Sequence, residues 1–170
     1  YDINVGDDNP TTNIIHSSTE DAPLLGDEVS IQQFQKAGIG PVTIDVLAVF
    51  GPTGSNPVVA AGWYESGDES SLTELFTVTN SPSSNGQRLN PPVTGSTSFD
   101  PGNTTFGFYS RWPFFSNRLL FSEDALNTFS GNIPHHVRVY ELKDGNGNIQ
   151  PNAYIVATEE HISGFDYQDI

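Results

Sequence analysis

Turn residues divide most of the chain into short β-like segments, and this punctuation constrains the fold more than any other feature. From about residue 28 onward, short runs of apolar and β-branched residues alternate with Gly, Pro, Asn and Ser. Residues 144–148 read Asp-Gly-Asn-Gly-Asn and are the strongest hairpin signal, because such residues adopt the positive φ angles of tight turns. We therefore expect antiparallel strands joined by turns.

The predicted strands differ in how they alternate. Residues 136–142 place Val137 and Val139 on one face and Arg138 and Tyr140 on the other. One helical turn is predicted over 122–127, with Ser122 as its N-cap. The pattern favours an all-β fold, an antiparallel β-sandwich or jelly roll of about nine strands with little helix. The strands are predicted over 29–34, 42–50, 58–65, 72–79, 87–89, 104–111, 118–121, 137–142 and 154–158.

The chain of 170 residues is long enough for one domain with its own core. Residues 1–27 are polar and turn-rich, with one β-like patch at 12–16, and predict an N-terminal arm or linker ahead of a β-sandwich domain over 28–170. Cysteine and methionine are absent, so we expect no disulfide framework and a processed or trimmed end at Tyr1. Together with the acidic, turn-rich composition, this predicts a secreted protein, extracellular or at the cell surface.

The charge balance restricts the partners. Six basic residues face 21 acidic ones, for a formal net charge of −15. Such a chain is repelled by nucleic acids and by anionic lipid, so we expect neither as a partner, and no apolar run is long enough to insert into a membrane. The excess acid has two interpretations: solubility, or carboxylates that converge on a hard cation.

The acidic residues near the C-terminal end favour calcium as a cofactor. A Glu-Glu pair directly follows a predicted strand, two aspartates come a few residues later, and a further acidic pair lies in the turn at 122–127. Calcium takes six to eight oxygen ligands in irregular geometry, and carboxylates at strand ends supply them. The alternative is a set of separate, solvated acids on loop tips. The candidate metal ligands are Glu123, Asp124, Glu159, Glu160, Asp166 and Asp169.

Other acidic groups are weaker candidates. Asp144, Asn146 and Asn148 have the spacing that starts a helix–loop–helix calcium loop, but the twelfth position is Ile155, where a bidentate Glu is required. A hairpin turn explains them better. The groups at 7–9 and 68–69 are interpreted as solvated turns.

Aromatic residues form two dense groups, at 63–64 and at 106–115. Most are expected in the core, but residues 111–115 read as a loop after a strand and are harder to bury whole. Exposed rings of β-sandwich modules stack on sugar rings, and they also contact neighbouring subunits. The candidate ligand-binding residues are Trp112, Tyr109, Arg111, Trp63 and Tyr64.

The sequence contains little that indicates catalysis. The four histidines show no His-Glu-x-x-His pattern, and Gly-x-Ser-x-Gly is absent. His161 beside Glu160 has two interpretations, a general base or a loop histidine with its hydrogen bonds satisfied. We therefore expect a protein that is not an enzyme.

Residues 105–109, 122–127, 135–140 and 159–169, with Ala-Gly-Trp-Tyr at 61–64 upstream, resemble an uncharacterised β-sandwich module of large secreted bacterial multidomain proteins. The resemblance covers roughly residues 42–170. It implies an extracellular parent protein, neighbouring carbohydrate-active or immunoglobulin-like domains and calcium-supported folding, but no activity. In such modules the Asp-Tyr-Gln-Asp stretch runs into an apolar strand, whereas this chain stops at Ile170. Three alternatives follow as expectations: order ends at this point, the last strand is removed, or another chain donates it.

Three functions follow as expectations. The first is a calcium-binding, non-catalytic module that binds carbohydrate or mediates adhesion, with a polysaccharide or glycan surface as its partner. The alternative is a structural subunit of an extracellular filament or surface layer, assembled with neighbouring subunits by strand exchange. The third is a glycan-active hydrolase or lyase.

Overall fold

The computed structural model describes residues 26–51, 56–79, 87–129 and 134–160. Within these ranges the chain forms eleven short strands and two 3-10 turns, with no α-helix. The prediction of an all-β, antiparallel fold with little helix is confirmed. No helix in the described part of the chain is long and apolar enough to cross a membrane. The predicted arm over 1–27, including its patch at 12–16, lies almost entirely outside the described residues.

A five-stranded antiparallel sheet forms the centre of the molecule. Its order is β6 (Val93–Gly95), β4 (Thr73–Val78), β3 (Val59–Glu65), β8 (Phe106–Trp112) and β9 (Arg118–Phe121). Gly62 sits at a register shift in β3, where a Cβ atom would lie 2.1 Å from the Thr73 carbonyl oxygen. Only glycine fits there, so this position sets how closely β3 and β4 approach.

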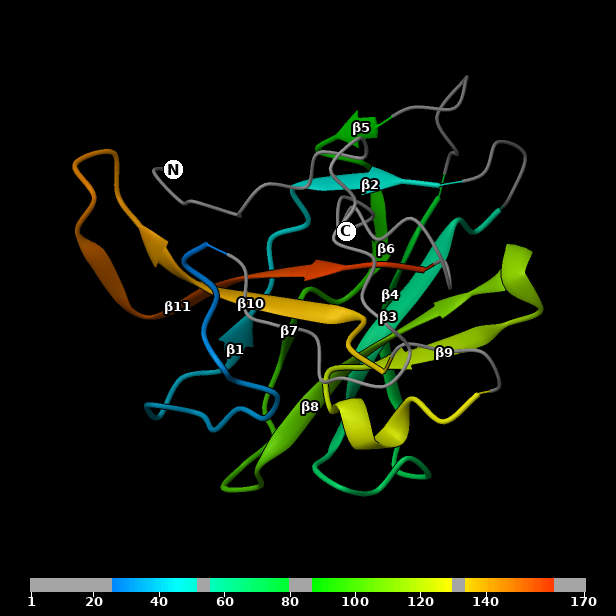
Figure 1. Cartoon of the computed structure of the whole chain (residues 1–170), viewed down its shortest axis with the longest axis horizontal. Coiled ribbons are helices and arrows are strands. Elements are labelled where there is room, and N and C mark those ends of the chain that lie inside the picture. The colour runs from blue at the N-terminus through cyan, green and yellow to red at the C-terminus, as the bar shows by residue number, and fades with distance from the viewer. Residues whose placement is uncertain (1–25, 52–55, 80–86, 130–133, 161–170) are drawn as a thin grey trace.

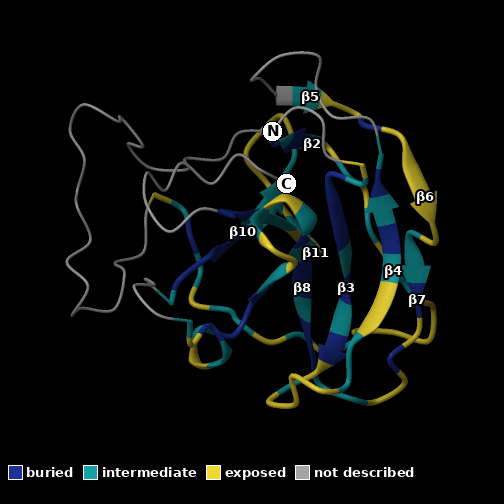
Figure 2. Cartoon of the chain, turned by 90° about the vertical axis from the view of Figure 1, so that its right-hand side faces the viewer, coloured by how far each residue is buried: buried dark blue, intermediate teal, exposed yellow. Residues whose placement is uncertain are grey.

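Three two-stranded antiparallel pairs accompany this sheet. They are β1 (Val42–Thr43) with β7 (Ser98–Phe99), β2 (Ala48–Phe50) with β5 (Gln87–Leu89), and β10 (Val137–Lys143) with β11 (Ile149–Thr158). The β10–β11 hairpin crosses in front of the five-stranded sheet in Figure 1 and lies to one side of β8 in Figure 2.

The predicted hairpin turn is confirmed. The Asp144 N–H donates to the Asn148 carbonyl at 2.9 Å, and the Asp144 carboxylate accepts the backbone N–H groups of Asn146 and Asn148 at 2.8 and 2.9 Å. Gly147 supplies the positive φ of 80°. The turn therefore uses the Asp144 carboxylate for its own backbone.

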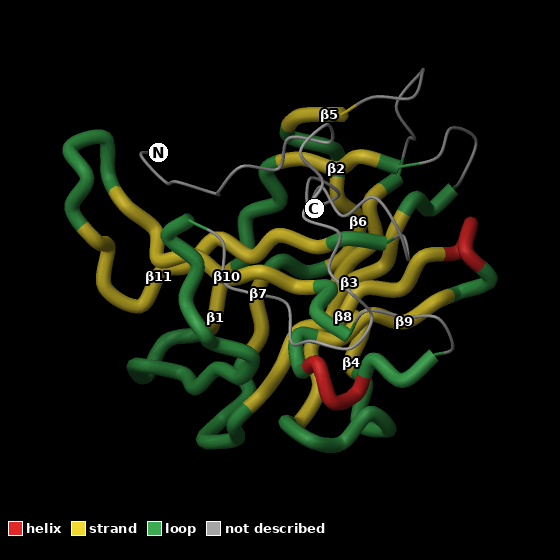
Figure 3. Tube along the Cα trace, viewed as in Figure 1, coloured by secondary structure: helices red, strands yellow, loops and turns green. Residues whose placement is uncertain are grey.

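Several strand predictions need correction, as the tube in Figure 3 shows. Residues 29–34 form no strand and make one isolated bridge, between Phe34 and Phe106, while residues 42–50 divide into β1 and β2. β6 and β7 lie where no strand was predicted, because their pairing with β4 and β1 is long-range and leaves no local pattern. The turn at 122–127 is a 3-10 turn, η2 (Asp124–Leu126), with Glu123 rather than Ser122 at its N-cap.

Apolar residues from both faces of the five-stranded sheet are buried. They form two hydrophobic clusters, one on each face. Trp112 and Tyr109 of β8 belong to different clusters, because side chains three positions apart on a strand point to opposite faces. The smaller cluster contains Tyr64, Tyr109 and Phe121. The larger one, called the apolar cluster below, contains Val49, Val58, Val59, Phe76, Val78, Trp112 and Leu120.

Residues 26–36, called the strap below, connect the hairpin to the central sheet. The Val29 N–H donates to the Val139 carbonyl of β10 at 2.9 Å. Further along, Phe34 exchanges two backbone hydrogen bonds with Phe106 of β8, at 2.7 and 2.9 Å. The blue strap is therefore flanked by β10 at one end and β8 at the other (Figure 1).

Candidate functional site

The turn between β9 and η2 positions the first two predicted metal ligands. The Asn127 side chain accepts the Phe121 N–H and donates to the Phe121 carbonyl, both at 2.9 Å, which closes the turn. The Ser122 hydroxyl donates to the Gln32 carbonyl of the strap at 2.8 Å. Glu123 and Asp124 are thereby directed toward the strap.

The buried Glu123 carboxylate is held by neutral donors. It accepts hydrogen bonds from Gln33 Nε2 at 2.9 Å, from the Gly67 N–H at 3.0 Å and from the Ser66 hydroxyl at 3.3 Å. Three donors from two other segments therefore hydrogen-bond this carboxylate. Its contacts join the strap to the β3–β4 connection.

Four ionisable residues from three segments form a second group, called the charged cluster below. His135 contacts Asp124 through Nδ1 at 2.9 Å and Glu28 through Nε2 at 2.8 Å. The other Glu28 oxygen accepts from the Arg138 guanidinium. Arg138 is fully buried, and Glu28 and His135 are each 7% exposed. The charged cluster therefore consists of Glu28, Asp124, His135 and Arg138.

The pKa values of the two neighbouring histidines are shifted in opposite directions. Burial alone would lower the pKa of His135, but hydrogen bonds and charges from Asp124 and Glu28 outweigh it and raise the pKa to about 9. Burial lowers the pKa of His136 to about 4, against the hydrogen bond from its Nδ1 to the Glu159 carbonyl at 2.7 Å. These pKa values favour an imidazolium at His135, between two carboxylates, and a neutral imidazole at His136 near neutral pH.

Glu159 and Glu160 lie at the end of β11 and are buried, with exposures of 2% and 8%. The Glu159 N–H donates to the His136 carbonyl at 2.9 Å. Arg118 of β9 donates to the Glu160 carbonyl at 2.7 Å. These backbone contacts fix the strand end between β9 and the start of β10.

The predicted metal ligands are thus divided between two places. Glu123 and Asp124 form hydrogen bonds with the strap, whereas Glu159 and Glu160 directly follow the last residue of β11. Among the residues that the structure describes, no group of three or more acidic or histidine side chains is placed to hold a metal ion. The two other predicted ligands, Asp166 and Asp169, lie outside the described residues, as does His161.

Three of the predicted ligand-binding residues are buried aromatic side chains. Trp112 and Tyr64 are fully buried, and Tyr109 is 5% exposed. The Trp112 indole N–H donates to the Ser110 hydroxyl at 3.0 Å, so a hydrogen bond inside the fold satisfies it. These rings offer no exposed face to a sugar, because the turn η1 (Pro113–Phe115) folds the chain back and leaves Trp112 inside.

The other two predicted ligand-binding residues have different surroundings. Trp63 is half-buried and stacks on Phe99, with ring centroids 5.3 Å apart. Arg111 pairs with Glu74 across the sheet. The exposed ring of this region is Phe114, at 59%, on the connection between β8 and β9.

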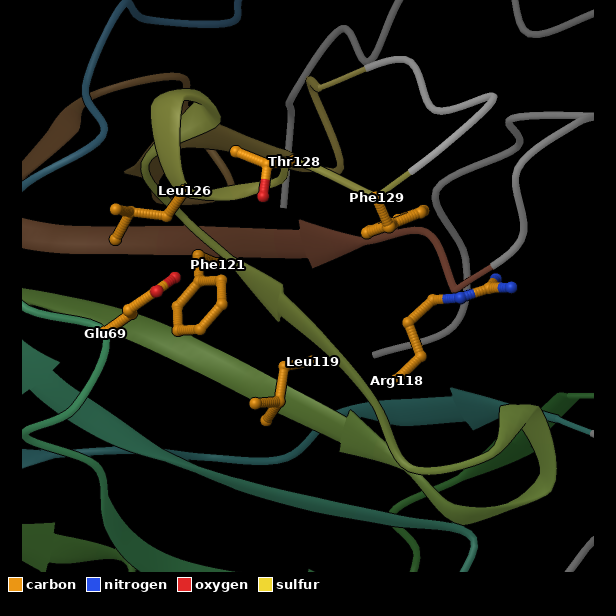
Figure 4. Close-up of a pocket in the computed structure, with 7 residues that line it drawn as sticks. All are labelled: Glu69, Arg118, Leu119, Phe121, Leu126, Thr128 and Phe129. Atoms are coloured by element: carbon orange, nitrogen blue, oxygen red, sulfur yellow. The ribbon is translucent and has the colours of Figure 1, made fainter.

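A shallow hollow of about 470 Å³ lies beside β9 (Figure 4). Leu119, Phe121 and Leu126 form its apolar part, while Glu69 and Arg118 are at opposite ends. Arg118 is already engaged, because it donates to Glu160 and lies 5.2 Å from the Phe115 ring. The hollow contains none of the predicted ligand-binding or metal-binding residues.

Sequence reasoning missed the residues that join these segments. Glu28 and His135 are 107 positions apart, and Gln32 and Asp124 are 92 apart, so no local spacing relates them. Arg138 is predicted on the strand face opposite Val137 and Val139, and the structure shows it fully buried. The one available signal is the presence of an arginine between Val137 and Val139 in an otherwise apolar run.

Comparisons of the chain with protein-family models, with curated proteins and with solved structures find no match. The function is therefore argued from the geometry of the chain itself.

Proposed function

We propose that this chain is a calcium-binding, non-catalytic extracellular module that binds carbohydrate or mediates adhesion. We further propose that its sheets form a β-sandwich, with the β10–β11 hairpin belonging to the second layer. The observation that carries the calcium site is the burial of two consecutive carboxylates, Glu159 and Glu160, at the end of β11, a few residues before Asp166 and Asp169 in the sequence. A divalent cation offsets the repulsion of adjacent buried carboxylates.

The proposed calcium site uses fewer ligands than the sequence analysis predicted. Glu123 and Asp124 are engaged with donors from the strap and with His135. The proposed ligands are therefore Glu159, Glu160, Asp166 and Asp169, which lie within eleven positions of one another. Calcium tolerates such a compact set because it accepts carbonyl oxygens and water beside the carboxylates.

The charged cluster supports a non-catalytic role. A general base needs a free nitrogen lone pair at the working pH, whereas both His135 nitrogens contact carboxylates and its pKa is raised to about 9. The His136 Nδ1 is bonded to a backbone carbonyl. We therefore assign structural rather than catalytic roles to both histidines.

Calcium binding is tested by thermal unfolding and by titration calorimetry. The melting temperature should rise by several degrees in calcium relative to EDTA, and Glu160→Gln should abolish most of that difference. Glu69→Gln is the matched control, since it removes one exposed carboxylate from another part of the surface. Equal melting curves in calcium and EDTA for the unaltered chain would refute the calcium site.

Carbohydrate binding is tested on the exposed ring. Phe114→Ala should remove binding on a glycan array, because an exposed aromatic face stacks on the apolar face of a sugar. Phe129→Ala, on a half-buried ring, provides the comparison. An array on which the unaltered chain retains no glycan would leave adhesion to protein as the binding function.

A second candidate is a subunit of an extracellular filament or surface layer. It is favoured by the strap, whose side chains dock between separate elements of the fold. Electron microscopy of the concentrated chain distinguishes the two candidates: ordered assemblies support the subunit, and dispersed particles support the binding module.

A further inference from the structure

We propose that the strap, residues 26–36, exchanges between two copies of this chain. The surface that the strap contacts, formed by residues of β8, β10 and η2, is then an interaction site for the strap of a second copy. This inference rests on the second candidate under Proposed function and gives it a specific segment and acceptor.

The strap is recognised mainly through side chains, as a bound peptide is. Gln32 and Asp124 form a reciprocal pair: Gln32 Nε2 donates to the carboxylate at 2.8 Å, and the Asp124 N–H donates to Gln32 Oε1 at 3.1 Å. Glu28 enters the charged cluster at one end. At the other end the Phe34 ring lies 5.1 Å from the Phe108 ring and 5.8 Å from the Tyr154 ring.

Backbone pairing of the strap is sparse by comparison. It consists of isolated bridges at Glu28–Tyr140 and Phe34–Phe106. The β10–β11 hairpin, in contrast, pairs continuously from Val137–Thr158 to Glu141–Tyr154. A segment anchored by separate side-chain pockets can leave and re-enter without unzipping a ladder, so the strap is separable from the sheets.

A hinge follows the strap directly. Residues 37–41, with the sequence Ala-Gly-Ile-Gly-Pro, are all exposed, and Ile39 is fully exposed. A Cβ atom built at Gly38 or Gly40 meets nothing within 4 Å. This connection is free of packing, so it can change direction at little cost and carry the strap to another copy.

Both ends of the strap carry ion pairs with the body of the molecule. Lys36 of the strap pairs with Asp100 at 2.5 Å, and Asp27 of the strap pairs with Lys143 at 2.7 Å. Every contact of the docked strap is the same whether it comes from its own chain or from a second copy. The two arrangements therefore differ mainly in hinge geometry and in the entropy of association, which protein concentration offsets.

These ion pairs provide the test, because Lys36 and Lys143 are the two lysines of the chain. Equal amounts of unlabelled and nitrogen-15-labelled full chain are mixed, incubated at high concentration, diluted and cross-linked briefly with a carbodiimide. Exchange predicts cross-linked peptides, Lys36 with Asp100 and Lys143 with Asp27, that combine one labelled and one unlabelled partner. Their fraction should exceed that of a dilute, unincubated mixture at least about tenfold.

Two variants distinguish exchange from chance collision. Glu28→Gln weakens docking equally in both arrangements, so mixed peptides should form faster and reach the same final fraction. Leu89→Ala, an exposed position outside the strap, should leave the rate unchanged. Equal rates in the two variants would assign the mixed peptides to collisions and contradict the proposal.

Only same-label peptides at every concentration, even after incubation just below the melting temperature, would overturn the exchange. That result would not affect the calcium site, which is read from melting with and without EDTA.

Discussion

The apolar cluster and the three buried members of the charged cluster, Glu28, His135 and Arg138, are stabilised by different interactions. Trp112 and Val78 of the apolar cluster have no exposed surface, and neither does Arg138 of the charged cluster. Apolar contact is non-directional, so a replacement of similar volume restores most of it. A buried ion pair depends on each partner, because removing one leaves the other charge desolvated. The charged cluster should therefore be the more sensitive to single changes.

Replacing Arg138 by methionine should give the largest effect. The change keeps much of the side-chain volume but leaves the Glu28 carboxylate without its guanidinium partner, and it should lower the free energy of unfolding by about 3–5 kcal/mol. Urea denaturation measures it. The double variant with Glu28→Gln should cost less than the sum of the two single changes. If Arg138→Met lowered the free energy of unfolding by less than about 1 kcal/mol, the charged cluster would be no more sensitive to single substitutions than the apolar cluster.

The pH dependence of stability should separate the two histidines. The stabilisation from His135 is complete below its unfolded pKa near 6.5 and is lost as pH rises through about 9, whereas that from His136 is complete above 6.5 and is lost as pH falls toward 4. Each change in the free energy of unfolding is on the order of 3 kcal/mol, and stability should be greatest near pH 6.5.

Denaturation in EDTA across this range measures both effects. His135→Gln should flatten the alkaline side of the profile, and His136→Gln the acidic side. A variant that flattens the opposite side would show that the charge states are assigned the wrong way round.

Within the apolar cluster, Val78→Ala should lower the free energy of unfolding by about 2 kcal/mol, through lost burial and a residual cavity. Val93→Ala on the exposed strand β6 is the control and should change it by less than about 0.5 kcal/mol. Similar losses at the two positions would mean that β6 is covered in solution.

Leu120→Met should have the smallest effect, below about 1.5 kcal/mol, because the swap nearly conserves volume in the same cluster. The measurement is again urea denaturation. A loss as large as that of Arg138→Met would contradict the expected tolerance of the apolar cluster.

The sequence predicted those elements whose signals are local. The strand at 118–121 and the hairpin turn at 144–148 were predicted with their observed bounds, because strand patterning and turn chemistry are properties of neighbouring residues. β6 and β7 were missed, since each is short and exists through a distant partner.

The candidate site was less predictable, because its contacts also depend on residues far apart in the sequence. The aromatic run at 106–115 was recognised, but which ring it exposes depends on the turn at Pro113–Phe115, which buries Trp112 and exposes Phe114. The pairing of Glu123 with Gln33, and of Glu28 with His135, joins residues 90 and 107 positions apart.

The sequence by itself determined the all-β class, the hairpin and the acidic character of the chain, because turn propensity, alternation and charge are encoded residue by residue. The tertiary structure decided which acids are neutralised by donors, which rings are buried and that residues 26–36 dock as a strap. Those outcomes depend on side chains meeting from segments far apart in sequence, and only the folded arrangement determines which of them meet.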